Sequence, residues 1–191
     1  MAHLLLTLLL AAGSAAGLTP VPVAFPLLNQ RVASVSAGGN MNIVTYAMGA
    51  TLQPERRWVV SLYRGTLTHQ TLLGAGPGAT FTLQFLAPAH AALVPVLGAQ
   101  SGRDADKRAE CAAAGFAWER DESAPDGEGD DLLPGCPLYL RMTLLDWLPT
   151  GAADNDKCHD LCLCRVEATT SDAPESKFLT TDACRAAGLI P

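Results

Sequence analysis

The sequence predicts a mainly β (α+β) protein, an antiparallel barrel with short flanking helices. Several short segments alternate apolar and polar residues with a period of two, as half-buried strands do. The connections between them are mostly too short for the crossovers that parallel strands need. With 191 residues, of which 49% are hydrophobic, the chain is long enough for one well-buried core and short for two. We therefore expect a single domain.

The strand-like segments share β-branched and aromatic residues and turn residues at their ends. In the segment RWVVSLY, for example, Trp58, Val60 and Leu62 alternate with the side chains of the other face. The expected strands cover residues 42–48, 57–63, 79–86, 137–148 and 159–168.

Helical patterns lie between these strands, over residues 66–73, 88–97 and 104–114. Asp104 stands where it can cap the last of them. The segment 121–135 is rich in acids, Gly and Pro and has no periodicity, so we expect a surface loop there; an acidic binding site is the alternative.

The N-terminal residues 1–18 contain an apolar run followed by small residues, which is the pattern of a cleaved secretory or organellar leader. On this interpretation the mature protein begins near Gly17 or Leu18, and residues 19–191 form the domain. The alternative is a retained helix that packs on the domain of a cytosolic protein. The apolar run is too short to span a bilayer, and no later stretch approaches that length, so no membrane span is expected.

Six cysteines occur without any CxxC pair. A chain of this size does not need disulfides for stability, so we expect free thiols, although a disulfide framework behind a leader is an alternative. Cys162 and Cys164 alternate on an expected strand and would face the same side. Their spacing is unlike that of structural zinc sites, so no metal is expected.

The net charge of −6 argues against a nucleic-acid surface, because binding to the phosphate backbone needs an excess of basic residues. Two local clusters could nevertheless hold one anion. Arg64, Thr66 and Thr68 follow the strand 57–63 at the start of a helix, and Arg103 and Lys107 stand at the next helix start. Helix N-termini attract phosphate groups. Alternatively, the arginines pair with surface carboxylates and the threonines cap helices.

Several segments, in their order and spacing, resemble the flavin reductase-like, FMN-binding split-barrel family over residues 20–190. They are NMNIVTYAMGATLQPERRWVVSLYRGTLTHQTLL, FTLQFLAPAHAALVPVLGAQSGRDADK, PLYLRMTLLDWLPTG and LTTDACRAAGLI. The resemblance implies an antiparallel Greek-key split β-barrel that binds FMN and forms a homodimer. It also implies hydride transfer from NADH or NADPH to the flavin. FMN is favoured over FAD because no segment looks like an adenine-ribose site, although the family includes FAD users.

The resemblance further implies which residues contact the flavin. The isoalloxazine ring would contact the segment that contains Asn42, Thr45, Tyr46, Ala47 and Met48. The phosphate would be held by residues of the strand end and helix start, with help from the following basic loop: Ser61, Tyr63, Arg64, Thr66, Thr68, Arg103 and Lys107.

His159 is the candidate catalytic residue by the same resemblance. The family commonly has a Gly-Asp-His turn near the nicotinamide, whereas this chain has Lys157, Cys158 and His159. Gln84 also stands where the family often has Asn. The departure leaves two further hypotheses open: a non-catalytic FMN-binding or storage protein, and a secreted, disulfide-stabilised binding module.

Overall fold

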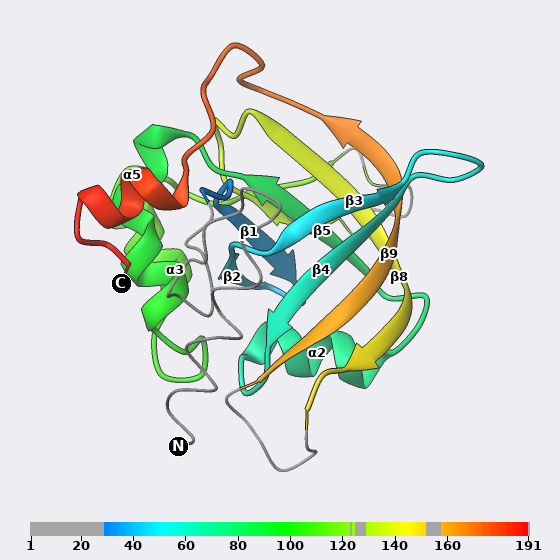
Figure 1. The fold of residues 1–191 in the computed structure, drawn as a ribbon. Coiled ribbons are helices and arrows are strands. Elements are labelled where there is room, and N and C mark those ends of the chain that lie inside the picture. Colours follow the sequence, from blue (N-terminus) through cyan, green and yellow to red (C-terminus); the bar gives the residue numbers. More distant parts are fainter. Residues whose placement is uncertain (1–28, 123, 125–128, 152–157, 191) are drawn as a thin grey trace, which may run out of the picture.

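The computed structural model describes residues 29–122, 124, 129–151 and 158–190. The expected leader over residues 1–18 lies outside these ranges. The described chain forms one seven-stranded antiparallel sheet with helices at its margins (Figure 1). A separate two-stranded hairpin consists of β6 (Glu119–Arg120) and β7 (Asp131–Leu132).

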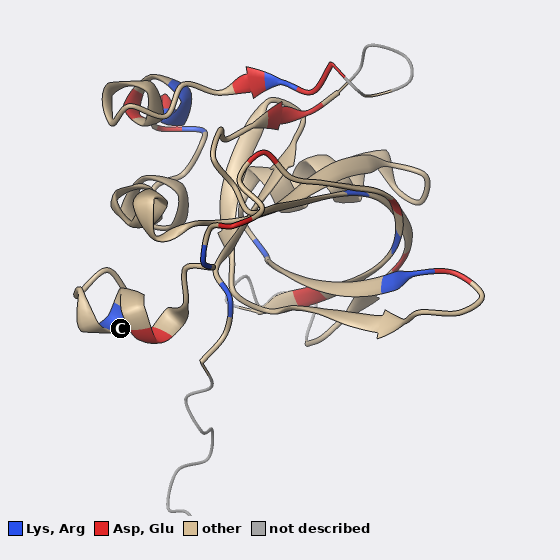
Figure 2. Cartoon of the chain, turned by 90° about the horizontal axis from the view of Figure 1, so that it is seen from above, with Lys and Arg blue, Asp and Glu red and all other residues tan. Residues whose placement is uncertain are grey.

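The sheet has the strand order β2-β1-β5-β8-β9-β4-β3. It curls strongly into a half-barrel, as Figures 1 and 2 show. The expected mainly β, antiparallel class is confirmed; closure into a Greek-key split barrel stays a prediction. The strands are β1 (Ala33–Ala37), β2 (Asn40–Val44), β3 (Ala47–Thr51), β4 (Arg57–Tyr63), β5 (Thr80–Phe85), β8 (Leu138–Pro149) and β9 (His159–Thr170).

One expected strand was wrong, and one strand of the structure was not predicted from the sequence. The segment 42–48 is not a single strand, because the chain bends at Thr45 and Tyr46 and passes from β2, at one end of the strand order, to β3 at the other. Its β-branched and aromatic residues continue through the bend, so the pattern hid the break. β1 was missed because its sequence, ASVSA, is short and weakly hydrophobic, although all five residues are buried.

The helices follow the expected segments with small shifts. The segment 88–97 begins as the 3-10 helix η2 (Pro88–Ala92) and continues as α3 (Leu93–Ala99). Asp106, not Asp104, caps the third segment, since its side chain accepts a hydrogen bond from Ala109 N. The remaining helices are α2 (Leu67–Ala75), α4 (Lys107–Ala113) and α5 (Thr181–Ala186).

Charged residues are distributed unevenly over the described chain (Figure 2). The hairpin β6–β7 carries acidic residues, so part of the expected acidic loop is a short β structure. Asp131 of this hairpin is buried and forms an ion pair with Arg108. In the part of the chain that the structure describes, no helix is both long and apolar enough to cross a membrane.

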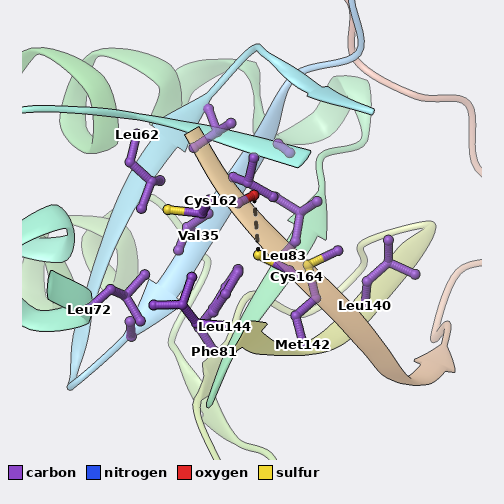
Figure 3. Packing of buried hydrophobic residues seen from close by; sticks show 14 of the residues in the cluster. Val35, Leu62, Leu72, Phe81, Leu83, Leu140, Met142, Leu144, Cys162 and Cys164 are labelled. Atoms are coloured by element: carbon purple, nitrogen blue, oxygen red, sulfur yellow. Dashed lines mark hydrogen bonds between the residues drawn. The ribbon is translucent and has the colours of Figure 1, made fainter. Parts of the chain in front are cut away.

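The core inside the curled sheet explains the period-2 pattern. Phe81, Leu83 and Phe85 of β5 belong to one buried cluster with Val60 and Leu62 of β4. In Figure 3, Leu62, Phe81 and Leu83 meet the labelled side chains of β8 and β9, and Cys164 Sγ donates to Cys162 O at 3.5 Å. A second buried cluster lies between the sheet and the flanking helices.

All six cysteines are free in the structure, which therefore gives no support to the disulfide-stabilised alternative. Five are buried, including the strand neighbours Cys162 and Cys164, which behave as small apolar residues. Burial raises the pKa of the Cys162 thiol to about 12, and the nearby Asp160 carboxylate adds to the shift. Cys158 alone is partly exposed.

Titration with a thiol reagent tests this arrangement. In the native protein we expect fast reaction at Cys158 only, because the other five thiols are buried and the reacting species is the thiolate, which attacks the reagent. Unfolding in guanidinium without reductant should release all six. A count below six after unfolding would show that disulfides exist.

Candidate functional site

A cavity of about 400 Å³ opens where β4 turns into α2. One wall is the β4–α2 turn, and the other is the segment that joins α3 to α4. The floor comes from β2. The lining residues are Asn40, Asn42, Tyr63, Arg64, Gly65, Thr66, Leu67, Gly98, Ala99, Gln100, Ser101 and Gly102.

The turn into α2 presents hydrogen-bond donors to this cavity. Gly65 has φ +80°, a left-handed conformation that favours glycine. Thr66 caps the helix: its Oγ1 accepts from His69 N at 3.2 Å and donates to Tyr63 O at 2.9 Å. The first N–H groups of a helix have no acceptor within the helix, so this end attracts anions.

The opposite wall is held against β2 by close packing. A β-carbon at Gly102 would lie 2.2 Å from Asn40 Oδ1, so only glycine lets the segment approach this closely. Asn40 Nδ2 in turn donates to Thr68 Oγ1 at 2.9 Å. Gln100 Oε1 is buried without a hydrogen-bond partner among the described residues.

Lys107 lies behind this wall, and its side chain is buried. Its Nζ donates to Met41 O at 3.0 Å, Leu97 O at 2.9 Å and Asn42 Oδ1 at 3.2 Å. Burial lowers the pKa of Lys107, a shift that the Cys111 thiol partly opposes. Since an ammonium has three N–H donors, these bonds favour a structural role over the expected phosphate contact.

Two tyrosines and His159 form an aromatic group beside the cavity. The rings of Tyr63 and Tyr46 meet the His159 ring edge-on, with centroids 5.2 and 6.3 Å away. Tyr46 is 57% exposed and Met48 67%, so this side is open. Burial lowers the pKa of His159, although the Asp160 carboxylate opposes the shift, and the imidazole is therefore neutral near pH 7.

The structure thus separates the predicted site residues into two groups. The lining of the cavity contains four of them: Asn42, Tyr63, Arg64 and Thr66. The others lie beside it, behind it or on the neighbouring strand β3, namely Thr45, Tyr46, Ala47, Met48, Ser61, Thr68, Arg103, Lys107 and His159.

Sequence reasoning missed Asn40, Gln100 and Ser101 as lining residues. An available signal was the SG pair directly before a basic residue at an expected helix start.

A buried ionic cluster lies directly under the β4–α2 turn. The carboxylate of Asp160 accepts from Arg64 Nε at 2.8 Å, from Arg64 Nη2 at 2.7 Å and from His69 Nε2 at 3.0 Å. Thr150 N donates to it at 3.2 Å. Burial alone would raise the pKa of Asp160, but these hydrogen bonds outweigh burial and lower it. The carboxylate therefore stays ionised and fixes Arg64.

His69 is left with one unused nitrogen. Because the Asp160 carboxylate can only accept, His69 Nε2 donates this hydrogen bond, and Nδ1 is the other ring nitrogen. This Nδ1 is buried and has no partner among the described residues. The ring packs against Trp147, with centroids 4.9 Å apart.

A second cavity, of about 630 Å³, lies on the other side of the same turn. Arg64 and Gly65 line both cavities. Arg103 reaches over the turn into the second one, where its Nη1 donates to Gly65 O at 3.0 Å. The remaining lining residues are His69, Gln70, Leu73, Trp147, Pro149, Gly151 and Asp160.

The variant Asp160→Asn tests the ionic cluster. Removing one partner of a buried ion pair leaves the other charge uncompensated, so we expect the free energy of unfolding at neutral pH to fall by about 3–5 kcal/mol. The folded-state pKa of Asp160 is lowered. Its stabilising contribution is therefore complete above the unfolded pKa of about 3.9 and disappears as pH falls towards the folded value. Below about pH 4 the wild type should lose stability more steeply than the variant.

Urea denaturation across this pH range measures both effects. Asp182→Asn is the matched control, because Asp182 pairs with Arg185 on the exposed face of α5. Surface pairs contribute about 0–1 kcal/mol. Equal losses in the free energy of unfolding for the two variants would contradict the proposed importance of the cluster.

Sequence comparison with known proteins found no match, whereas structure comparison found several. No protein-family profile matches the chain, and no curated protein matches its sequence. Among solved structures, an FMN-binding protein from Thermus thermophilus with bound 1-cyclohex-2-enone is 23% identical, with a TM-score of 0.60 over 83% of this chain and 78% of that chain.

Two further structures agree. A Streptomyces globisporus NADH:FAD oxidoreductase is 17% identical with a TM-score of 0.63, covering 80% of this chain and 81% of that chain. A flavoredoxin from Methanosarcina acetivorans is 13% identical with a TM-score of 0.63, covering 86% and 91%. The chain therefore has a flavin reductase-like fold, shared with FMN-binding proteins and flavin reductases.

Proposed function

We propose that the protein binds FMN in the cavity at the end of β4 and acts as a flavin reductase-like oxidoreductase that uses NADH or NADPH. The observation that carries this proposal is the cavity itself, where a helix N-terminus, two hydroxyl groups and an aromatic group converge. Such convergence of polar groups in one concave site is typical of cofactor binding. The fold shared with flavin-binding proteins supports it.

The lining residues fit a phosphorylated flavin. The volume of about 400 Å³ lies within the usual range for ligand sites. Ser101 and the first turn of α2 would hold the phosphate, joined by the Thr66 hydroxyl once it rotates away from Tyr63 O, and Arg64, fixed by Asp160, would form the wall behind them.

The residues of the chain would bind and orient the flavin, and the flavin would supply the hydride-accepting chemistry. The segment from Asn42 to Met48, which crosses between the sheet edges, would contact the ring. Tyr46 and Tyr63 would exclude water from one side of it. His159, neutral near pH 7, would offer a hydrogen bond at the open side, where a nicotinamide approaches.

We also infer a homodimer. Residues paired directly across strands point to the same face, so the register places Met48, Val59 and Leu163 together, with Leu148 and Leu161 as neighbours. This outer face includes an apolar groove of about 280 Å³. Met48 and Leu148 are 67% and 60% exposed, and large exposed apolar patches mark association sites.

Light scattering after size exclusion tests the dimer. The wild type should have twice the mass of the chain, and Met48→Glu combined with Leu148→Glu should give a monomer, because two buried charges in an apolar interface are unfavourable. Leu73→Glu, which changes an exposed leucine of α2, is the control. A monomeric wild type would overturn the inference.

The purified protein, loaded with FMN, tests the reductase function. Under anaerobic conditions, NADPH or NADH should bleach the flavin absorbance quickly. Tight binding of FMN without bleaching by either nucleotide would favour the non-catalytic binding or storage alternative. A colourless protein that takes up no flavin would contradict both.

Affinities for FMN and riboflavin test the phosphate site, because the two ligands differ only in the phosphate. Ser101→Ala and Thr66→Ala should each weaken the affinity for FMN about tenfold to a hundredfold and leave the affinity for riboflavin nearly unchanged. Thr71→Ala is the control, since its hydroxyl donates to Leu67 O within α2. Equal losses of affinity for FMN and riboflavin would show that the phosphate does not lie at these hydroxyls.

A further inference from the structure

We infer that Asn40 is a positioning residue for the phosphate in the proposed FMN cavity, because its amide joins the two walls and fixes the distance between their hydrogen-bond donors. The inference rests on the proposed function, since it concerns the same site. It gives a role to a buried amide of β2 at the floor of the cavity. That role requires no contact between Asn40 and the phosphate.

One end of the Asn40 amide is bonded to the first turn of α2. Asn40 is 6% exposed, and its Nδ2 donates to Thr68 Oγ1 at 2.9 Å. Thr68 is 1% exposed and follows the cap Thr66 by two residues, so it belongs to this turn and is closed off from the ligand. The N–H groups of the turn are the proposed phosphate donors. The amide therefore fixes this wall of the cavity relative to β2.

The other end of the same amide lies against the opposite wall. A β-carbon at Gly102, the residue after Ser101, would stand 2.2 Å from Asn40 Oδ1. Gly102 is not among the glycines with positive φ, so the restriction there is steric. Gly98, near the end of α3, also packs closely on β2, because its β-carbon would lie 3.3 Å from Ile43 Cγ1. This wall is therefore seated directly on β2.

The Asn40 amide cannot easily yield to a side chain at Gly102. A terminal side-chain atom usually swings away from such a clash, but the hydrogen bond to Thr68 holds this amide in place. With a methyl group at Gly102, the wall that carries Ser101 would have to retreat by about 1 Å to reach ordinary contact distance. The gap between the Ser101 hydroxyl and the first turn of α2 thus depends on Asn40.

A phosphate is sensitive to this gap, because its hydrogen bonds require donor–acceptor distances of about 2.5–3.2 Å. A wall displaced by about 1 Å would bring its donors out of this range. Riboflavin has no phosphate and would be much less affected. The ratio of the affinities for FMN and riboflavin therefore distinguishes a positioning role from general support of the fold.

Dissociation constants for FMN and riboflavin, measured by flavin fluorescence, test the inference. Gly102→Ala and Asn40→Ala should each weaken the affinity for FMN by about tenfold, while the affinity for riboflavin changes less than about threefold. In the double variant the new methyl group has room where the amide was. The combined loss of FMN affinity should therefore be smaller than the product of the two single losses.

Substitutions of Thr68 test the same link from the side of α2. Thr68→Val keeps the shape of the side chain and removes the hydroxyl, so it should lower the FMN affinity as Asn40→Ala does. Thr68→Ser keeps the hydroxyl and should recover most of the affinity. Gly74→Ala is the matched glycine control, because Gly74 is exposed on α2 and a β-carbon there would meet open space. It should change neither affinity.

The inference is overturned if Asn40→Ala and Gly102→Ala leave the ratio of FMN to riboflavin affinity unchanged, or if their losses multiply fully in the double variant. Should Asn40→Ala fail to fold by circular dichroism, equal FMN affinities of Thr68→Val and Thr68→Ser would overturn it in the same way. In these results the wild type still binds FMN, and the proposed function stands. A wild type that binds no flavin would contradict the proposed function, and the inference with it.

Discussion

The buried carboxylate of Asp160 is the interaction on which the candidate site depends. It lies at the start of β9 and holds Arg64 at the end of β4 and His69 in α2, two elements that are far from it in sequence. Hydrogen bonds from both side chains keep it ionised in spite of burial. Without this anchor the turn at Gly65 would lose its support, and the two cavities that share the turn would lose their common wall.

Positive charge near the turn is arranged in layers. Arg64 is neutralised by Asp160 and acts mainly as a rigid wall, whereas Arg103 lies outside it and is exposed. Lys107 is farther inside and supports the segment between α3 and α4 through three acceptors. In an acidic protein this arrangement gives a local anion site without a basic surface.

The sequence pattern predicted what depends on local periodicity. The strand 57–63 has its expected bounds, and the cap of α2 at Thr66 followed from the polar residues after that strand. The pattern could not show contacts made across long separations, such as Gly102 on Asn40 or Arg64 on Asp160. For the same reason the pattern could not show that the Lys107 ammonium donates to three acceptors within the protein, because a basic residue at a helix start looks alike whether its ammonium points outward or inward.

The crossing at Thr45 and Tyr46 has a consequence for how the molecule acquires its site. The crossing joins strands at opposite ends of the sheet, and the ionic anchor closes a loop with a separation of 96 residues. Contacts this distant form late, since their closure entropy must be overcome first. We therefore expect the binding wall to be absent from the folding transition state. A ligand that recognises only the finished wall would retard unfolding and leave the folding rate unchanged, so it would extend the lifetime of the native state.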